Sequence, residues 1–349
     1  MNSSTTMKAV ILVGGEGTRL RPLTYTTVKA MVPILNKPFI EHVINYLRSH
    51  GIGEVILAMG YKPDVIREYF DKHPMSARLI YSVEEAPLGT AGAVKYAEQY
   101  ISDTFFVFNG DVFCDIDLTA MLRFHRSNKS VATIALTPVD DPSQFGVIEM
   151  DTNQRVKQFI EKPKREEAPS NMINAGVYIL EPQIFDRIPP GERCMFEHNV
   201  FPGLIADNKA VFGYAADTAY WIDTGTPQKY MQLNRDLLSG KSSQICSRHG
   251  EIITGKDTII HRGARLVPPV LVDQKCIVAR DAQIIGPTIL GRDCKVGEGA
   301  IVESSILWEN VEIGRGAIVK NSILGNNNIV PDNRIIDSQV IGSDNRPSV

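Results

Sequence analysis

Residues 284–302 read IIGPTILGRDCKVGEGAIV. An aliphatic residue recurs there at every sixth position: Ile284, Leu290, Val296 and Val302. The step continues back to Ile260 and, with occasional steps of five, forward to Ile341. A β-helix of triangular section needs this period, because one aliphatic side chain per short strand points inward and a small following residue allows the corner. An amphipathic helix needs a period of 3.6, so the repeat predicts about five stacked coils around one core.

Upstream of residue 240 the chain instead alternates short β-rich runs with helical patterns. The predicted strands are 7–13, 54–58, 79–83 and 104–108, and the predicted helices are 40–47, 64–70, 90–101 and 227–238. Strands separated by helices imply crossover connections and a largely parallel sheet with helices on both faces. We therefore expect an α/β domain over 1–240, a linker over 241–250 and the repeat domain over 251–349.

Composition excludes several classes of protein. The chain has 349 residues, of which 43% are hydrophobic and 22% charged, so it can bury a substantial core. Its 37 basic and 40 acidic residues give a formal net charge of -3, without the basic stripe of a nucleic-acid binder. We see no membrane-spanning run and no secretory signal. The five cysteines are scattered and lack C-x-x-C spacing, which argues against disulfides and zinc. A cytoplasmic protein is expected.

The strongest chemical signal follows the first predicted strand, where residues 14–24 read GGEGTRLRPLT. Glycines at the carboxyl end of a strand let backbone N–H groups approach a phosphate or base closely, and ligands of open α/β sheets bind at that edge. The run is neither a Walker loop nor a dinucleotide fingerprint. Arg19 and the downstream Lys29 supply cations for a polyphosphate, which favours a nucleotide site over a simple turn.

This run, followed by Lys29, Pro33 and Lys37-Pro38, closely resembles the sugar-nucleotide pyrophosphorylases, a family of nucleotidyltransferases. The further matching segments are PLGTAG (87–92), NGD (109–111), FGV (145–147), EKP (161–163), NAG (174–176) and WIDTG (221–225). Together with the six-residue repeat, they are most similar to the mannose-1-phosphate guanylyltransferase branch. One departure is Val28, which stands before Lys29 where family members commonly have proline.

The resemblance implies a fold and a reaction. The fold is a Rossmann-like, mostly parallel mixed sheet flanked by helices, with a C-terminal left-handed parallel β-helix. The reaction joins an NTP and a sugar 1-phosphate into an NDP-sugar and pyrophosphate. GTP with mannose 1-phosphate is the first expectation, and glucose 1-phosphate with dTTP or UTP is the runner-up. A non-catalytic subunit that senses nucleotide sugar is an alternative of another class. An added acyltransferase activity of the β-helix is a third, disfavoured because no histidine follows His261.

The resemblance also implies roles for individual residues. The expected catalytic residues are Arg19, Lys29, Lys162 and Asp111. The expected nucleotide-binding residues are Leu12, Gly14, Gly15, Gly17, Thr18, Arg19, Glu85, Gly89 and Asn109. The expected sugar-phosphate-binding residues are Gly146, Glu161, Lys162, Asn174 and Gly176. Asp111 and Asp223 are expected to hold Mg²⁺, which prefers one or two carboxylates plus phosphates and water. Glu84 and Glu85 either accept from a guanine edge or are plain exposed charges.

Two expectations concern partners. The substrates are an NTP and a sugar 1-phosphate, with no nucleic acid and no membrane. An exposed terminal coil or flat face of a β-helix invites pairing with another subunit, so a homo-oligomer, a dimer or higher, is expected.

Overall fold

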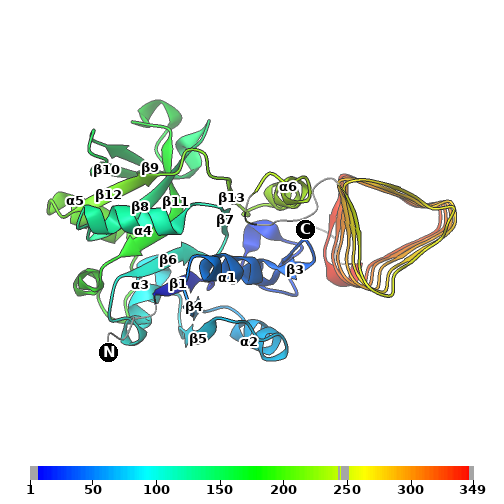
Figure 1. Ribbon diagram of the computed structural model, residues 1–349, viewed down its shortest axis with the longest axis horizontal. Helices are drawn as coiled ribbons and strands as arrows, with labels where there is room; N and C mark the ends of the chain where they lie inside the picture. Colours follow the sequence, from blue (N-terminus) through cyan, green and yellow to red (C-terminus); the bar gives the residue numbers. More distant parts are fainter. Residues whose placement is uncertain (1–6, 243, 245–250, 346–349) are drawn as a thin grey trace. The chain divides into compact units, whose positions relative to one another are not determined.

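The computed structural model describes residues 7–242, 244 and 251–345 (Figure 1). The chain folds as two compact units. Unit 1 is formed by the chain up to Gly15 and by Val43–Trp221, and unit 2 by Glu16–His42 and the chain from Ile222 onward. The linker predicted over 241–250 lies largely outside the described residues, and the domain boundaries at 240 and 250 stay a prediction. No helix in the described ranges combines the length and apolar character that crossing a bilayer requires.

Unit 1 is an α/β structure built on a nine-stranded sheet. Its strands are β1 (Lys8–Leu12), β4 (Glu54–Met59), β5 (Arg78–Val83), β6 (Phe105–Asn109), β8 (Ala132–Pro138), β9 (Gly146–Met150), β10 (Val156–Glu161), β11 (Met172–Leu180) and β12 (Val211–Ala215). The path runs β10-β9-β11-β6-β1-β4-β5. Off this path, β8 pairs with β11, and β12 pairs with β8. The short strand β7 (Val112–Cys114) follows β6. Strands β6, β1, β4 and β5 are parallel, whereas β11 is antiparallel to its neighbours.

The helices of unit 1 follow the predicted alternation. They are α2 (Pro63–Lys72), α3 (Gly89–Tyr96), α4 (Leu118–Ser127) and α5 (Phe201–Ala206), and α1 (Phe39–Ser49) begins in unit 2 and ends in unit 1. Helix α3 contacts β1 and β4, and α4 contacts β8 and β12. The mostly parallel mixed sheet flanked by helices is therefore confirmed.

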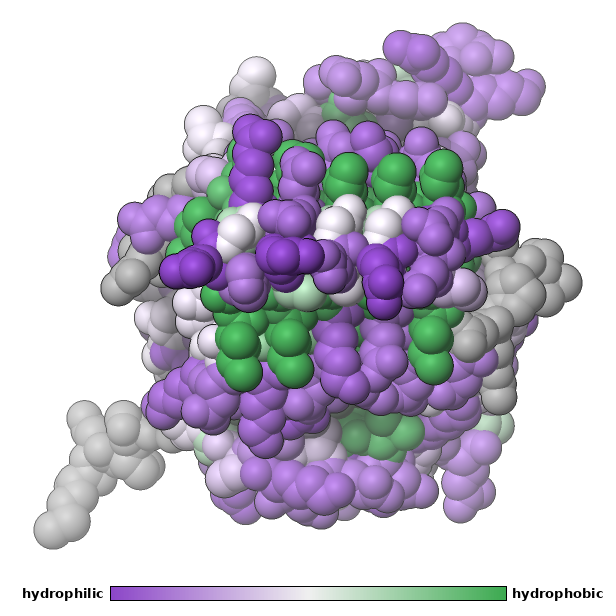
Figure 2. All heavy atoms as spheres, turned by 90° about the vertical axis from the view of Figure 1, so that its right-hand side faces the viewer, coloured by the Kyte–Doolittle hydropathy of each residue, from purple (hydrophilic) through white to green (hydrophobic). Residues whose placement is uncertain are grey.

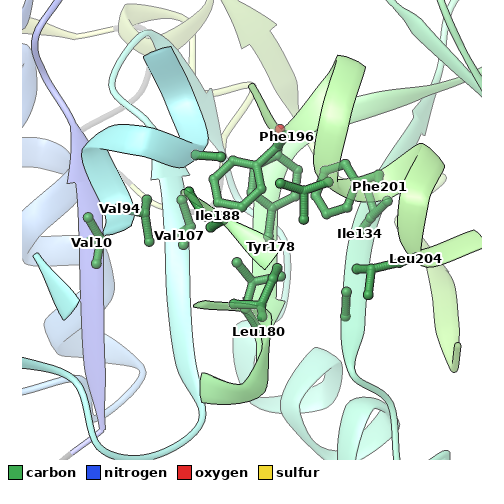
Figure 3. Close-up of a cluster of buried hydrophobic side chains, with 14 of the residues drawn as sticks. Val10, Val94, Val107, Ile134, Tyr178, Leu180, Ile188, Phe196, Phe201 and Leu204 are labelled. Atoms are coloured by element: carbon green, nitrogen blue, oxygen red, sulfur yellow. The ribbon is translucent and has the colours of Figure 1, made fainter. Parts of the chain in front are cut away.

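The core of unit 1 lies between the sheet and the helices α3 and α5 (Figure 3). Val10 and Val107 come from neighbouring parallel strands, and Tyr178 from β11 is fully buried. Phe196 and Phe201 stack with their ring centroids 5.4 Å apart. Aromatic side chains bury large apolar areas, so this cluster contributes much of the apolar burial in unit 1.

Unit 2 contains the predicted β-helix, whose coils show a triangular outline in Figure 1. One six-stranded and two five-stranded parallel sheets form its three sides. Their strands are β14 (Ile252–Thr254), β15 (Ile259–Ile260), β16 (Arg265–Val267), β17 (Val270–Val272), β18 (Ile277–Val278), β19 (Gln283–Ile285), β20 (Thr288–Leu290), β21 (Lys295–Val296), β22 (Ile301–Glu303), β23 (Ile306–Leu307), β24 (Glu312–Ile313), β25 (Ile318–Lys320), β26 (Ile323–Leu324), β27 (Ile329–Val330), β28 (Ile335–Asp337) and β29 (Val340–Ile341).

The aliphatic residues of the repeat stack inside this helix as the sequence predicted. Ile284 pairs with Val302 above it, and both are fully buried. From the third coil on, paired residues are 17 apart, as in Leu290 and Leu307. Gly291, which follows Leu290, must be a glycine because the next coil lies close to it. A Cβ on Gly291 would lie 2.6 Å from the carbonyl carbon of Trp308. The prediction of a parallel β-helix with small residues at its corners is confirmed.

The remaining elements of unit 2 are short. The segment 16–42 forms the hairpin β2 (Pro33–Ile34) and β3 (Lys37–Pro38). Helix α6 (Pro227–Leu238) begins where predicted, with the Thr226 hydroxyl accepting a hydrogen bond from the Lys229 amide. Pro227 occupies the first helical position, where its missing N–H costs nothing. The strand β13 (Trp221–Asp223) precedes α6 and carries the predicted metal ligand Asp223.

Candidate active site

The carboxyl ends of β1 and β6 lie side by side in unit 1. Leu12, the last residue of β1, pairs with Asn109, the last residue of β6. The Gly110 amide donates to the Leu12 carbonyl at 3.0 Å, and a Cβ on Gly110 would lie 2.2 Å from that oxygen. Glycine is therefore necessary in the NGD motif, because the chain crosses the end of β1 in contact with its backbone. The turn puts Asp111 at the edge of the sheet where ligands of α/β proteins bind.

Glu84 supports the glycine-rich turn. A Cβ on Gly14 would lie 3.2 Å from Glu84 Oε1, and the other carboxylate oxygen accepts a hydrogen bond from the Leu88 amide at 3.3 Å. Burial raises the pKa of Glu84, and its neighbour Glu85 is exposed. Glu84 thus joins the turn after β1 to the loop before α3, whereas base recognition by Glu85 stays a prediction.

The loop at the start of α3 is fastened to the segment before α5. Gly89 has a φ of 76°, and a Cβ there would lie 2.7 Å from the Cys194 carbonyl oxygen. The Thr90 hydroxyl donates to Glu197 at 2.9 Å and accepts from the Phe196 amide at 3.0 Å. Burial raises the pKa of Glu197, which the sequence analysis did not single out. The predicted nucleotide loop is therefore hydrogen-bonded to a partly buried carboxyl group of the segment before α5.

The predicted sugar-phosphate residues of β9 and β10 are direct neighbours. Gly146 pairs with Glu161, and a Cβ on Gly146 would lie 2.9 Å from Glu161 Oε2. Lys162 follows with a φ of 48°, and its ammonium nitrogen lies 3.3 Å from Glu161 Oε1. The Lys162 side chain is 61% exposed, so its charge is accessible to a phosphate.

Asn174 and Gly176 lie next to Asn109. The Asn174 amide nitrogen donates to the Tyr178 hydroxyl at 2.8 Å, and its oxygen accepts from the Gly176 amide at 2.9 Å. The register of β11 shifts between Asn174 and Tyr178, which re-aims the intervening residues. A Cβ on Gly176 would lie 2.8 Å from Asn109 Nδ2. Asn109 Oδ1 is buried without a hydrogen-bond partner in the described part of the chain, and such a group suits a bound ligand.

Unit 2 carries the other half of the predicted catalytic set. Gly17 has a φ of 66°, and a Cβ there would lie 3.0 Å from the Lys29 Cβ. The Thr24 hydroxyl donates to the Gly17 carbonyl at 2.8 Å. Thr18 then opens a short 3-10 helix, Thr18–Leu20, that carries Arg19. This folding puts the backbone of Gly17 beside Lys29, so the two ends of the motif are close in space.

Arg19 and Asp223 meet at Gly225. A Cβ on Gly225 would lie 2.5 Å from Asp223 Oδ1 and 3.0 Å from Arg19 Nη1. Asp223 Oδ1 accepts from the Gly225 amide at 2.7 Å, and its other oxygen forms an ion pair with the Lys229 ammonium group. Lys229 was missed by the sequence analysis. Its signal is its place in the first turn of a helix that opens directly after the WIDTG motif.

The predicted site residues thus form two groups. Unit 1 carries Leu12, Gly14, Gly15, Glu85, Gly89, Asn109, Asp111, Gly146, Glu161, Lys162, Asn174 and Gly176, and unit 2 carries Gly17, Thr18, Arg19, Lys29 and Asp223. Each group has its own internal contacts, and the roles of these residues stay predictions. The pairing of Asp111 with Asp223, which belong to different units, is likewise a prediction.

Comparison with known families agrees with this geometry. Residues 8–240 match the model of the family described as nucleotidyl transferase, and residues 266–346 match that of the GMPPB C-terminal domain. The chain therefore belongs to the nucleotidyl transferase family, and the prediction of a nucleotidyltransferase with a C-terminal β-helix is confirmed.

Individual relatives are similar over most of the chain. It is 38% identical to a mannose-1-phosphate guanylyltransferase of Mycobacterium tuberculosis, over 85% of this chain and 79% of the relative. It is 33% identical to a UTP–glucose-1-phosphate uridylyltransferase of Synechocystis, over 86% of this chain and 82% of the relative. Among solved structures, HddC from Yersinia pseudotuberculosis, also determined in complex with GMP-PN, is similar. One HddC structure matches with a TM-score of 0.59 and 31% identity, over 66% of this chain and all of that chain.

Proposed function

We propose that this nucleotidyltransferase transfers a guanylyl group from GTP to mannose 1-phosphate, giving GDP-mannose and pyrophosphate. The proposal is supported by relatives named mannose-1-phosphate guanylyltransferase in Mycobacterium, Oryza and Dictyostelium, at 35–38% identity. The single structural observation behind it is the group of Asn109, Asn174, Gly176, Glu161 and Lys162 at one sheet edge. This group combines hydroxyl-binding and phosphate-binding chemistry. A cytoplasmic location remains a prediction from the sequence.

The reaction asks mainly for positioning and charge neutralisation. A phosphate oxygen of the sugar 1-phosphate attacks the α-phosphorus of the nucleotide, and the bond to pyrophosphate breaks, so negative charge grows on the leaving group. In the proposed mechanism Arg19 and Lys29 stabilise that charge. Lys162 orients the phosphate of the attacking sugar. The Glu161 carboxylate and the Asn174 amide bind sugar hydroxyls, and the backbone near Gly14 and Gly17 approaches the nucleotide.

Nucleotidyltransferases of this kind generally use a divalent metal ion, and we propose Mg²⁺. Asp111 and Asp223 are its proposed ligands, because carboxylate oxygens suit this hard cation. The Asp223 carboxylate is oriented by the Gly225 amide, and the ion would share it with the Lys229 ammonium group. When bound, the ion would neutralise phosphate charge and hold both substrates. No group of three or more His, Cys, Asp or Glu side chains that could hold a metal ion gathers in the described ranges.

A second candidate has its own support. The Synechocystis relative acts, by its name, on UTP and glucose 1-phosphate, and it matches this chain over a similar length. Uridylyl or thymidylyl transfer to glucose 1-phosphate would use the same phosphate-binding residues. The two candidates differ only in the groups that contact the base and the sugar hydroxyls.

One assay separates the candidates. Pyrophosphate release would be measured with Mg²⁺ for GTP, dTTP, UTP, ATP and CTP against the 1-phosphates of mannose, glucose and N-acetylglucosamine. The proposal expects one strong combination, GTP with mannose 1-phosphate, lost in Asp111→Ala and retained in the control Asp64→Ala. Asp64 is an exposed carboxylate at the start of α2. A maximum with UTP or dTTP and glucose 1-phosphate would favour the second candidate. Folded protein inactive with every pair would favour a non-catalytic sensing subunit.

We further propose a homo-oligomer formed through the outer surface of the β-helix. Figure 2 shows rows of hydrophobic side chains on this surface, interrupted by hydrophilic ones. The outward residues of one side follow each other up the coils: Ile259, Ile277, Lys295, Glu312 and Ile329. Ile259 and Ile329 are 63% and 61% exposed.

This row is self-complementary about a twofold axis. Lys295 and Glu312 form an ion pair within the chain at 2.6 Å. An antiparallel second copy, with the axis between their coils, also places each lysine opposite the other copy's glutamate. The same axis places Ile277 opposite Ile329. A twofold interface uses one patch on both subunits, so this pattern favours a second copy over another protein.

Charge reversal tests the oligomer. Lys295→Glu and Glu312→Lys should each put like charges opposite one another and lower the mass measured by sedimentation, and the double swap should restore it. A wild-type monomer, or single variants with the wild-type mass, would contradict the proposal.

A further inference from the structure

The β-helix is hydrogen-bonded to the segment that carries Lys29, and one side chain of α6 joins them. The Trp308 indole N–H donates to the Tyr230 hydroxyl at 3.0 Å, and that hydroxyl donates to the Pro33 carbonyl at 2.7 Å. Trp308 follows β23 in the β-helix, Tyr230 lies in the first turns of α6, and Pro33 begins β2. All three belong to unit 2. Two successive hydrogen bonds therefore connect the repeat domain to the segment that carries Lys29.

The two side chains that form these hydrogen bonds are buried, so the bonds are costly to lose. Trp308 is 3% exposed and Tyr230 is completely buried. Burial raises the pKa of Tyr230 far above the neutral range, so its hydroxyl keeps the proton that it donates to Pro33. The Pro33 carbonyl is only partly buried, but a buried Tyr230 or Trp308 that loses its partner is left with an unsatisfied polar group, which costs free energy.

Further contacts hold the same hairpin. The Leu35 amide donates to Asn234 Oδ1 at 2.9 Å, and Asn36 Nδ2 donates to the Leu290 carbonyl of the β-helix at 2.9 Å. Leu35 and Asn36 both have positive φ, at 46° and 65°, a conformation that L-residues keep only when surrounding contacts hold it. The Tyr230, Asn234 and Leu290 contacts supply that constraint.

The hairpin in turn controls the backbone of Lys29. The Val32 amide donates to the Lys29 carbonyl at 3.2 Å, and the Phe39 amide donates to the Val32 carbonyl at 3.0 Å. Lys29 is thus four residues from Pro33 and connected to it through short-range hydrogen bonds. Helix α6 also carries Lys229, the ion-pair partner of Asp223. Helix α6 therefore contacts the β-helix, the segment that carries Lys29 and a proposed metal ligand.

We propose that Trp308 and Tyr230 are positioning residues for nucleotidyl transfer, through which the β-helix holds the backbone of 29–38 and hence Lys29. The proposal rests on the proposed function, in which Lys29 stabilises the leaving pyrophosphate. It assigns the repeat domain a direct part in the catalytic step, because Lys29 can act on the transition state only while its backbone is held in place.

The test uses variants that remove the hydrogen bonds. Tyr230→Phe removes the link to Pro33 and keeps the ring, whereas Trp308→Phe removes the donor to Tyr230 and also puts a smaller ring in place of the buried indole. The control is Val319→Ala, a fully buried β-helix residue in β25, which weakens the repeat domain without touching the hydrogen-bond chain. All are made in the full chain.

Tyr230→Phe should lower kcat about tenfold or more and leave the KM for sugar 1-phosphate unchanged, since displacement of a catalytic group costs up to about 10²-fold. Trp308→Phe should have a smaller effect of the same kind. The double variant should be no worse than Tyr230→Phe alone, because both act through one link. Val319→Ala should keep the wild-type kcat at a temperature where all variants are folded. Equal kcat in wild type and Tyr230→Phe, or an equal loss in Val319→Ala, would overturn the proposal.

Hydrogen exchange supplies a readout that needs no activity. In Tyr230→Phe the backbone amides of 29–38 should exchange about tenfold faster or more, whereas Val319→Ala should accelerate exchange in the β-helix and leave 29–38 unchanged. Unchanged exchange over 29–38 in Tyr230→Phe would refute the positioning role. If exchange over 29–38 is faster in Tyr230→Phe but the wild-type protein is inactive with every substrate pair, the link stands and the proposed function is overturned.

Discussion

Replacing Gly225 by alanine tests whether Arg19 and Asp223 need their present places. The new Cβ would lie 2.5 Å from Asp223 Oδ1 and 3.0 Å from Arg19 Nη1. Ordinary contacts begin at 3.4 Å, so the carboxylate must move by nearly 1 Å and the guanidinium by several tenths of an ångström. Gly225 does not have a positive φ, so the alanine backbone itself is unstrained.

The expected effect is on rate more than on stability. Misplacing a catalytic group by about 1 Å costs on the order of 10²-fold, and losing one donor to transition-state charge costs about 10²- to 10³-fold. We therefore expect kcat to fall about 100-fold. The displaced atoms are side-chain ends, so the free energy of unfolding should fall by no more than about 1–2 kcal/mol.

The assay combines pyrophosphate release with urea unfolding. Gly203→Ala is the matched control, because the nearest atom to its Cβ is Arg187 Nη1 at 3.8 Å and the residue lies in α5. This control should keep wild-type kcat and gain up to about 1 kcal/mol of stability from helix propensity. The reasoning would be refuted if Gly225→Ala kept more than half of the wild-type kcat, or if its loss of activity merely followed unfolding.

Three further outcomes are expected. Val296→Ala in the inner stack, where Val296 is 2% exposed, should lower the free energy of unfolding by about 2–4 kcal/mol in urea titrations, and the 62% exposed Ile335→Ala by less than about 1 kcal/mol. Lys162→Ala should lower kcat/KM for sugar 1-phosphate about 10²- to 10³-fold, whereas Lys164→Ala, an exposed neighbour, should not; equal kinetics would contradict the role of Lys162. Burial lowers the pKa of His125 below 6.5, so the unfolded chain binds a proton that the folded chain does not. Stability should therefore fall as the pH drops below about 6.5, and His125→Gln should flatten that dependence in unfolding measurements between about pH 5 and 8.

The β-helix was predictable because its information is local. Each coil repeats the same short pattern, and each aliphatic residue meets its counterpart 17 or 18 residues away, as Ile284 meets Val302. The cap of α6 was predictable for the same reason, since Thr226 bonds to a residue three positions on. The chemistry of the glycine-rich run could be inferred from residue types, because a tight turn with adjacent cations suits few ligands.

Other features depend on contacts between residues far apart in the chain. The proximity of Glu84 to Gly14 and the hydrogen bond between Thr90 and Glu197 leave no local pattern. Their members are ordinary charged residues, and such residues are usually solvated on the surface. Only the fold determines which of them are buried and paired.

The sequence by itself determined the two kinds of secondary-structure period, the strand-end motifs and the family to which the chain belongs. The periods follow from short-range sterics and from the alternation of apolar and polar residues, whereas the family follows from the resemblance of the motifs. The tertiary structure decided that Glu16–His42 belongs with α6 and the β-helix, and that Tyr230 links Trp308 to Pro33. No local rule predicts such a link, because buried polar groups find partners wherever packing brings them together, here across 78 and 197 residues.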